Sequence, residues 1–355
     1  MITRFLYPII IVLLFAGCEE IYNPNIDSVQ TQLVVESHVT NDPAQNYVKL
    51  SKTSDFYSTD SSEKVIGAKV SLVQVGGGEQ EGIEGDIGYF TFPNTPEPGK
   101  TYLLRIQYEN NNYESSQVLM PDLPTIDTLY TPHTINKQYV TDSYGSPQLV
   151  EDPGRNVSID APISENLKYY RFNYRAVLQW IYNPPAGGGF GPPPPSWFGW
   201  LSIFSISTFN IAGPKEFSVS EKIQNHPVLF LSYDSQQYLD SSQQSPSGWI
   251  VIIDEYGITK ESYDFREKLN QQFAAEGSLF DPVITQVYGN IRCTNDKSKI
   301  VLGFFDLNSY RQYRYFLNLS IYDDRGIQRR LNRYPAIPYK GYLIGDRPSF
   351  WEYNY

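Results

Sequence analysis

Short stretches in which apolar and polar residues alternate fill the chain from Leu33 to Met120. This period of two is typical of β-strands that bury one face. Turn-forming residues separate the stretches, among them Asn41-Asp42-Pro43 and Gly76-Gly77-Gly78. The stretches, rich in Val, Leu and Tyr, are 33–40, 47–53, 68–75, 89–92, 101–109 and 112–120. The pattern predicts an immunoglobulin-like β-sandwich over residues 32–124.

The segment Met120-Pro121-Asp122-Leu123-Pro124 marks the predicted end of this sandwich. Two prolines in so short a segment cannot continue a central strand. The rest of the chain, residues 125–355, is also strand-rich but less regular, so we expect a larger β-rich C-terminal domain. Its candidate strands are 155–162, 168–181, 199–208, 227–233, 248–254, 286–294, 299–306 and 311–322.

One segment of the second domain has a helical period instead. Between Thr259 and Gly277, the apolar residues Phe265, Leu269 and Phe273 recur every four positions. Thr259 or Ser262 is a suitable N-cap, and Gly277 suits the residue that follows a helix. The fold class expected is therefore mainly β, with one α-helix in the C-terminal domain.

An irregular segment, residues 183–200, separates two of the candidate strands. It contains three consecutive glycines and four consecutive prolines and ends in Trp197, Phe198 and Trp200. Two interpretations stay open. The tryptophans begin the next strand and pack inward, or the segment is an apolar loop that contacts a partner or ligand.

The N-terminus has the pattern of an export signal. Arg4 precedes an apolar run of twelve residues, Phe5 to Ala16, which is too short to cross a bilayer as a helix. The run leads into Leu14-Phe15-Ala16-Gly17-Cys18, which resembles a bacterial lipobox. We therefore expect residues 1–17 to be a lipoprotein signal peptide and Cys18 to carry the lipid, including palmitate. A plain secretory signal and a signal anchor are the alternatives.

A polar segment follows the cysteine. Residues 18–31 show no apolar period, which predicts a tether between the lipid and the fold. Without residues 1–17 the chain has 27 basic and 39 acidic residues, net −12. So acidic a chain argues against nucleic acid as a partner and against a general electrostatic attraction to anionic lipid. Cys293 is the one cysteine besides Cys18, so the mature chain cannot form an internal disulfide.

No motif for chemistry emerges from the sequence. The three histidines, His38, His133 and His226, are too far apart to form a metal-binding motif. The adjacent carboxylates Asp254 and Glu255 would point to opposite faces of a strand, so they do not suggest a catalytic pair. We expect no catalytic residues, no metal, no cofactor and no enzymatic activity.

Four stretches of the chain resemble the domain of unknown function 4249 family of the Bacteroidota. The first is LVVESHVTNDPAQNYVKLSKT, residues 33–53, and the second is GAKVSLVQV with residues 88–130. The third covers residues 262–291 and 299–316, and the last is Asp346-Arg347-Pro348-Ser349-Phe350-Trp351. Many members carry cysteines shortly before this closing motif, whereas this chain has none there.

This resemblance implies an outer-membrane lipoprotein, often encoded beside TonB-dependent transporters, with no established reaction. We expect a lipid-anchored protein on the periplasmic side or the cell surface, held to the membrane through Cys18. Its expected function is that of a non-catalytic accessory or binding subunit of a TonB-dependent β-barrel transporter. The alternative is a stand-alone surface protein that binds glycan or peptide, with Trp197 and Trp200 stacking on sugar rings.

Overall fold

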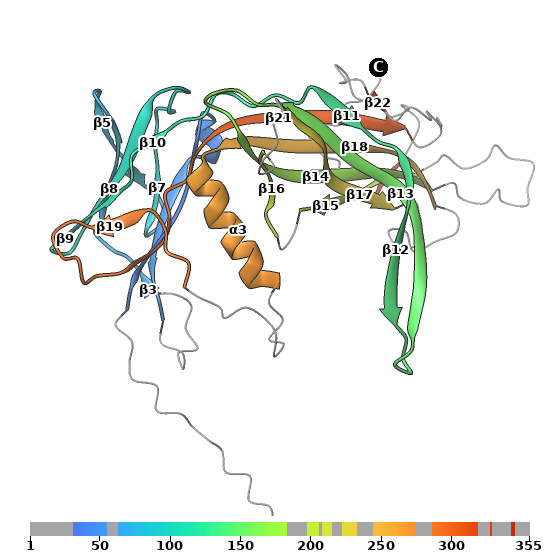
Figure 1. Cartoon of the computed structure of the whole chain (residues 1–355), viewed down its shortest axis with the longest axis horizontal. Helices are drawn as coiled ribbons and strands as arrows, with labels where there is room; N and C mark the ends of the chain where they lie inside the picture. The colour runs from blue at the N-terminus through green and yellow to red at the C-terminus, as the bar shows by residue number, and fades with distance from the viewer. Residues whose placement is uncertain are drawn as a thin grey trace, which may run out of the picture.

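The structure is a computed structural model that describes most of the chain between residues 31 and 344. The described residues are 31–54, 63–182, 197–205, 208–214, 222–232, 244–274, 286–318, 327–328 and 342–344. Cys18, the signal peptide and the tether up to residue 30 lie outside them. The described part is mainly β, as the sequence predicts, and is arranged as two sandwiches that share one sheet (Figure 1).

The first sandwich forms around the alternating strands near the N-terminus. One layer contains β1 (Leu33–Thr40), β2 (Tyr47–Lys52), β3 (Glu63–Lys64), β6 (Ile83–Glu84), β7 (Tyr89–Thr91) and β20 (Val301–Phe304). The other contains β4 (Lys69–Gln74), β5 (Glu79–Glu81), β8 (Thr101–Tyr108), β9 (Asn111–Ser115), β10 (Val118–Leu119) and β19 (Ile291–Cys293). Alternate residues such as Val35, Leu50, Val70 and Ile106 are buried between the layers. These are the apolar positions of the sequence pattern.

Two strands of this sandwich come from far along the chain. β20 pairs in parallel with β1, from Leu33↔Val301 to Glu36↔Phe304, and β19 pairs with β9. Cys293 is buried in the same core. A boundary at residue 124 therefore accounts for only part of the first sandwich, because its remaining strands follow the helix of the second region.

The second sandwich is built from longer strands. Its first layer contains β14 (Tyr169–Tyr182), β15 (Trp197–Phe204), β16 (Asn210–Ala212), β18 (Gln244–Ile258), β21 (Leu307–Asn318) and β23 (Tyr342–Ile344). Its second layer contains β11 (Thr128–Tyr130), β12 (His133–Thr141), β13 (Pro147–Pro162), β17 (Lys222–Ser232) and β22 (Ile327–Gln328). The core between these layers includes Ile159, Phe172, Leu178 and Val251.

The two sandwiches are joined through β1. At its C-terminal end, Val39 and Thr40 pair in parallel with Leu307 and Asn308 at the start of β21. The strand order β14-β18-β21-β1-β2 is therefore continuous from one sandwich into the other. Figure 1 shows the first sandwich to the left of the helix and the long strands β14, β18 and β21 to its right.

Helix α3 (Lys260–Ala274) covers the joint and confirms the predicted helix. Thr259 caps it, because its hydroxyl accepts a hydrogen bond from the Ser262 amide at 3.1 Å. The predicted apolar face is only partly covered: Phe265 stacks on Phe304, whereas Phe273 is 58% exposed. The buried side chains of the helix are instead those of Ser262 and Arg266. Within the described residues, no helix combines the length and apolarity needed to cross a bilayer.

Candidate functional site

A two-stranded β-arm projects from the second sandwich. It consists of β12 and the first part of β13, residues 133–153, which pair from Ile135↔Pro153 to Thr141↔Pro147. β13 pairs with β17 only from Gly154 onward, so within the described chain the arm has no third strand. Figure 1 shows the arm standing clear of the body, with its tip on the side of the molecule where β1 begins.

One face of the β-arm is mostly apolar. The cross-strand pairs Ile135↔Pro153 and Tyr139↔Leu149 lie on this face, because alternate residues of a strand share a side. Tyr139 is 76% exposed, and Ile135 and Leu149 are nearly half exposed. An ion pair between Lys137 and Glu151, with nitrogen and oxygen 2.6 Å apart, lies between the two apolar pairs. The opposite face carries the pairs Gln138↔Val150 and Val140↔Gln148.

The tip of the arm is an ordered turn. The Asp142 carboxylate accepts hydrogen bonds from the amides of Tyr144, at 2.9 Å, and Ser146, at 2.8 Å. These bonds, that of Ser146 first, lower the pKa of Asp142. Gly145 has a φ of +82°, which favours glycine at this position. The turn presents Tyr144, which is 92% exposed.

The arm has the features of a contact element. A lone two-stranded hairpin is marginally stable in water, and a surface that clusters exposed apolar side chains usually meets another molecule. Contact with another molecule would therefore cover the apolar face and stabilise the arm.

The sequence patterns did not reveal the arm. Residues 133–141 are not among the predicted strands, and the strand predicted at 155–162 begins at Pro147 in the structure. The sequence feature that could have revealed the arm is the turn Asp142-Ser143-Tyr144-Gly145, which lies between two stretches of β-forming residues. Pro147 and Pro153 argued against a strand, but edge strands tolerate proline.

The predicted aromatic contact residues lie on β15. The backbones of Trp197 and Phe198 pair with Tyr182 and Ile181 of β14, so the strand begins at Trp197. The Trp200 side chain is half-buried. The side chains of Trp197 and Phe198, and residues 183–196, lie outside the described part, so contact through this segment stays a prediction.

A buried polar cluster lies at the joint between the sandwiches. Arg266 of α3 forms an ion pair with Asp306, and both side chains are almost completely buried. Ser262 donates a hydrogen bond to the same carboxylate at 2.9 Å, and Asn308 donates another at 2.7 Å. Burial alone would raise the pKa of Asp306, but the charges of Arg266 and Arg171 outweigh it and hold that pKa well below its usual range.

Arg171 of β14 extends this cluster toward the aromatic side chains of Tyr256 and His38. Its guanidinium lies 4.0 Å from the ring centre of Tyr256, and His38 packs against the edge of the same ring. Burial, followed by the charge of Arg266, lowers the pKa of Arg171 to about 10. Burial and the charge of Arg171 lower the pKa of His38 to about 4. The cluster holds the helix and both sandwiches together and carries fixed charge at neutral pH.

The histidines occupy different environments. His38 contacts Tyr256 in the joint, His226 hydrogen-bonds Asn210 at 2.6 Å, and His133 lies at the base of the arm. In the part of the chain that the structure describes, no three His, Cys, Asp or Glu side chains are grouped as metal ligands.

Glu255 is a buried carboxyl in the second sandwich. Its side chain is fully buried, and neither carboxyl oxygen has a hydrogen-bond partner among the described residues. Burial raises the pKa of Glu255 to about 8, although the charge of Arg311 opposes the shift. The adjacent Asp254 instead accepts a hydrogen bond from the Tyr310 hydroxyl at 2.7 Å. Of the two neighbouring carboxyls only Asp254 accepts a hydrogen bond among the described residues, and as adjacent residues of β18 they point to opposite faces of the sheet.

Comparison with known proteins gives one match. The model of a protein family, described as a domain of unknown function (DUF4249), matches residues 19–314. No curated protein and no solved structure matches the chain. The matched range contains both sandwiches up to the middle of β21, and with them the arm and the joint.

Proposed function

Because the chain belongs to the family of the domain of unknown function DUF4249, we propose that it is a lipid-anchored binding subunit in the outer membrane. In this proposal, Cys18 carries the lipid and residues 19–30 tether the fold. The subunit is non-catalytic and associates with a TonB-dependent β-barrel transporter. The observation that carries the proposal is the β-arm, a two-stranded hairpin with an exposed apolar face.

The position of the arm supports a partner in the plane of the membrane. Thirteen residues lead from Cys18 to Thr31, where the described chain starts, and they span at most about 45 Å when extended. The arm tip points to the same side of the molecule as the beginning of β1 (Figure 1). A lipid at Cys18 would therefore keep the arm close to membrane proteins and raise their effective concentration.

The chemistry of the arm supports a protein partner. Its exposed face combines Tyr139, Ile135 and Leu149, the types of side chain that form the centre of protein interfaces. The outer edge of β12 has no neighbouring strand in the described chain, so its backbone amides and carbonyls are available to a partner strand. A β-barrel protein supplies extended segments of this kind in its loops and turns.

Affinity purification from gently solubilised membranes tests the proposal. The tagged chain should recover a β-barrel transporter, identified by mass spectrometry. The double variant Tyr139→Ser/Leu149→Ser removes the apolar face of the arm and should reduce recovery about tenfold or more. The matched control Gln138→Ser/Gln148→Ser alters the opposite face and should retain recovery. The proposal fails if no barrel is recovered or if both double variants recover it equally.

A stand-alone glycan- or peptide-binding protein is the alternative. The half-buried Trp200 of β15 favours this alternative, because two further aromatic residues, Trp197 and Phe198, precede it on the same strand. Saturable binding of a glycan to the chain, lost in Trp200→Ala and retained in Tyr139→Ser/Leu149→Ser, would support the alternative over the transporter subunit.

A further inference from the structure

The two strands of the β-arm direct alternate backbone groups outward. In an antiparallel pair, residues that exchange hydrogen bonds alternate with residues whose amides and carbonyls point to the outer edges. The Asp142 amide donates to the Ser146 carbonyl at 3.0 Å, and at the base of the arm the Asn156 amide donates to the Pro132 carbonyl at 3.2 Å. Both bonds join even-numbered residues, and the register between them has no shift. The backbone groups of the odd-numbered residues therefore face the outer edges.

The outer edge of β13 within the arm is guarded by proline. Among its outward-facing residues, Pro147 and Pro153 have no N–H and cannot donate a hydrogen bond to a further strand. Only Leu149 and Glu151, which lie between the two prolines, offer an amide donor there. Proline on an edge strand is one of the ways in which sheets prevent the addition of another strand.

The outer edge of β12 has no such protection. Each of its outward-facing residues has both an amide donor and a carbonyl acceptor; these residues are Ile135, Lys137, Tyr139 and Thr141. No other strand of the described chain pairs with this edge. An edge lysine also discourages strand addition, but Glu151 compensates the charge of Lys137, with nitrogen and oxygen 2.6 Å apart. The arm therefore has one guarded edge and one open edge.

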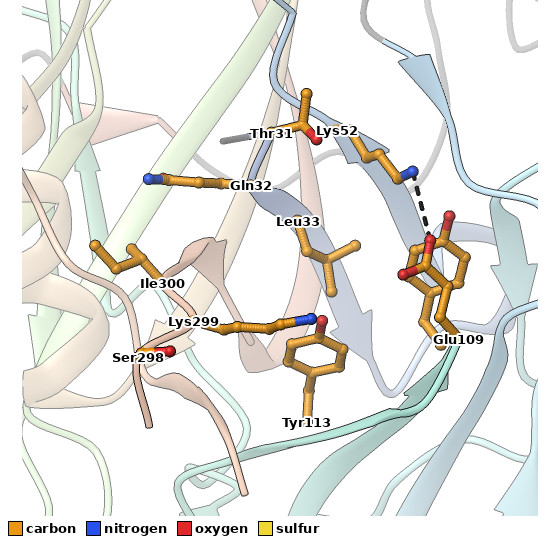
Figure 2. A pocket seen from close by; sticks show the side chains of 10 residues that line it. Thr31, Gln32, Leu33, Lys52, Glu109, Tyr113, Ser298, Lys299 and Ile300 are labelled. Carbon is orange, nitrogen blue, oxygen red and sulfur yellow. Dashed lines mark ion pairs between the residues drawn. The ribbon is translucent and has the colours of Figure 1, made fainter. Parts of the chain in front are cut away.

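The cavity of about 450 Å³ at the start of β1 differs from the arm in this respect (Figure 2). Leu33 in its wall pairs with Lys52 of β2 on one side and with Val301 of β20 on the other. Lys52 also forms an ion pair with Glu109, with nitrogen and oxygen 3.7 Å apart (Figure 2). The strand β1 thus has neighbours on both sides, whereas no strand of the described chain covers the outer edge of β12.

We propose that the open edge of β12 binds an extended segment of a partner protein, which adds a third strand to the β-arm. The segment exchanges backbone hydrogen bonds with β12, and its side chains extend both faces of the arm. In this mode of recognition, backbone hydrogen bonds supply affinity and alternate side chains supply specificity. The inference rests on the proposed function, since it specifies how the same arm recognises its partner.

The register of β12 defines the residue pattern that the segment needs. Residues of the segment opposite Ile135 and Tyr139 join the apolar face of the arm, so they are apolar or aromatic. The residue opposite Lys137 lies between them, and an acidic side chain there forms a cross-strand charge pair. The remaining residues lie on the other face, beside Asn136 and Gln138, and are polar. The expected pattern is apolar, polar, acidic, polar, apolar, which is the same in either chain direction.

Selection from a library of random peptides displayed on phage tests the proposal on the full chain. The enriched peptides should contain the expected pattern, and their synthetic forms should bind the chain saturably in fluorescence anisotropy. No enrichment, or enrichment of peptides without the pattern, would overturn the proposal. The selection involves no transporter, so strand addition can fail while the barrel is still recovered, and the reverse.

Two proline substitutions distinguish the edges of the arm. Lys137→Pro removes an outward amide from the open edge, and Glu151→Pro removes one from the guarded edge. Because the two residues face one another, each substitution also breaks the same ion pair. Lys137→Pro should weaken binding of the selected peptides about tenfold or more, whereas Glu151→Pro should not weaken it. Equal weakening by both substitutions would show that the open edge is not the site.

Hydrogen exchange on the wild-type chain gives a readout that needs no substitution. With a selected peptide at about ten times its Kd, the outward amides of Lys137 and Tyr139 should exchange about tenfold more slowly, because peptide carbonyls accept their hydrogen bonds. The inward amides of Asn136 and Gln138 already bond to β13 and should slow less. Mass spectrometry with fragmentation resolves the single amides. Uniform slowing along β12, or none, would contradict strand addition.

A second copy of the chain is the competing occupant of the open edge. Light scattering of the full chain in detergent measures its oligomeric state. A monomer, or a dimer that Lys137→Pro leaves intact, keeps the edge available to another protein and agrees with the proposal. A dimer that Lys137→Pro converts to a monomer would overturn it, because the chain itself would then occupy the edge.

Discussion

Arg266 in α3 forms a buried ion pair with Asp306, which lies forty residues further along the chain between β20 and β21. The pair fastens the helix to the point where β1 passes from one sandwich to the other. Asp306 also accepts hydrogen bonds from Ser262 and Asn308, so each of its oxygens has a partner. Removing Arg266 would leave the buried Asp306 with the charge of Arg171 alone, whereas removing Asp306 would leave both arginines buried without their shared carboxylate.

Arg266→Met should therefore destabilise the protein strongly. Removing one partner of a buried ion pair costs about 3–5 kcal/mol, because the remaining charge stays buried. Denaturant unfolding followed by fluorescence measures the loss. Asp306→Leu leaves Arg266 and Arg171 buried without their shared carboxylate and should be destabilised at least as strongly as Arg266→Met. A single variant that unfolds like the wild type would contradict a structural role for the pair.

Glu255 should make the free energy of unfolding depend on pH between about pH 4.5 and pH 8. Its folded pKa, about 8, is higher than the ordinary carboxyl value, so the folded state holds the proton more tightly than the unfolded state. The stability that the protonated Glu255 carboxyl contributes is fully present below about pH 4.5 and is lost as the pH rises through 8. Glu255→Gln cannot ionise and should escape this loss, which amounts to roughly 3–5 kcal/mol.

Unfolding free energies at several pH values check this expectation. The difference between Glu255→Gln and the wild type should grow in favour of the variant from pH 5 to pH 8 and then level off. A difference for Glu255→Gln that does not change with pH would mean that Glu255 is ionised when buried.

Gly303 should tolerate no side chain. It has a φ of +94°, and a Cβ there would lie 1.9 Å from the Val35 carbonyl oxygen in β1. Gly303→Ala must separate β20 from β1 and should cost about 3 kcal/mol or more, judged by its melting temperature. Gly78→Ala, at an open position in the turn after β4, should change the melting temperature little. Equal effects of both substitutions would contradict the close approach of β20 and β1.

The β-arm should be dispensable for folding. Residues 136–152 can be replaced by Asn-Gly, since Ile135 and Pro153 face one another in the register and a two-residue turn can join them. The shortened chain should keep its free energy of unfolding within about 1 kcal/mol, because the arm contributes no residue to either core. It should also lose transporter recovery in affinity purification. Recovery at the wild-type level would remove the arm from the proposed contact.

Local patterns located most of the longer strands, although the predicted bounds of β13, β17, β18, β19 and β21 differ by four residues or more at one end or both. The alternation in residues 33–40 matches β1 at both ends, and the candidate strand 168–181 differs from β14 by one residue at each end. Thr259 was one of two candidate helix caps, and the structure selects it over Ser262; a cap can be proposed from sequence because capping depends on residues close in the chain. These features are encoded within a few residues and need no information on the rest of the fold.

Pairings between distant residues could not be predicted in this way. Residues 299–306 have the period of a strand, but nothing in that period identifies β1 as the partner of β20. The burial of Arg266 likewise depends on Asp306, which no helical pattern includes. The β-arm was missed for a related reason, because its register from Ile135↔Pro153 to Thr141↔Pro147 joins stretches whose prolines argue against a strand.

The placement of β1 also has a consequence for how the chain is made. Its partners on one side, β20 and the start of β21, are among the last described strands to be synthesised. Until they emerge, β1 has an open edge and the first core lacks a wall, so the N-terminal region cannot finish folding while the chain is growing. An interrupted chain would present that open edge to proteases and to other chains. The first sandwich is therefore complete only after the chain has been synthesised as far as the start of β21.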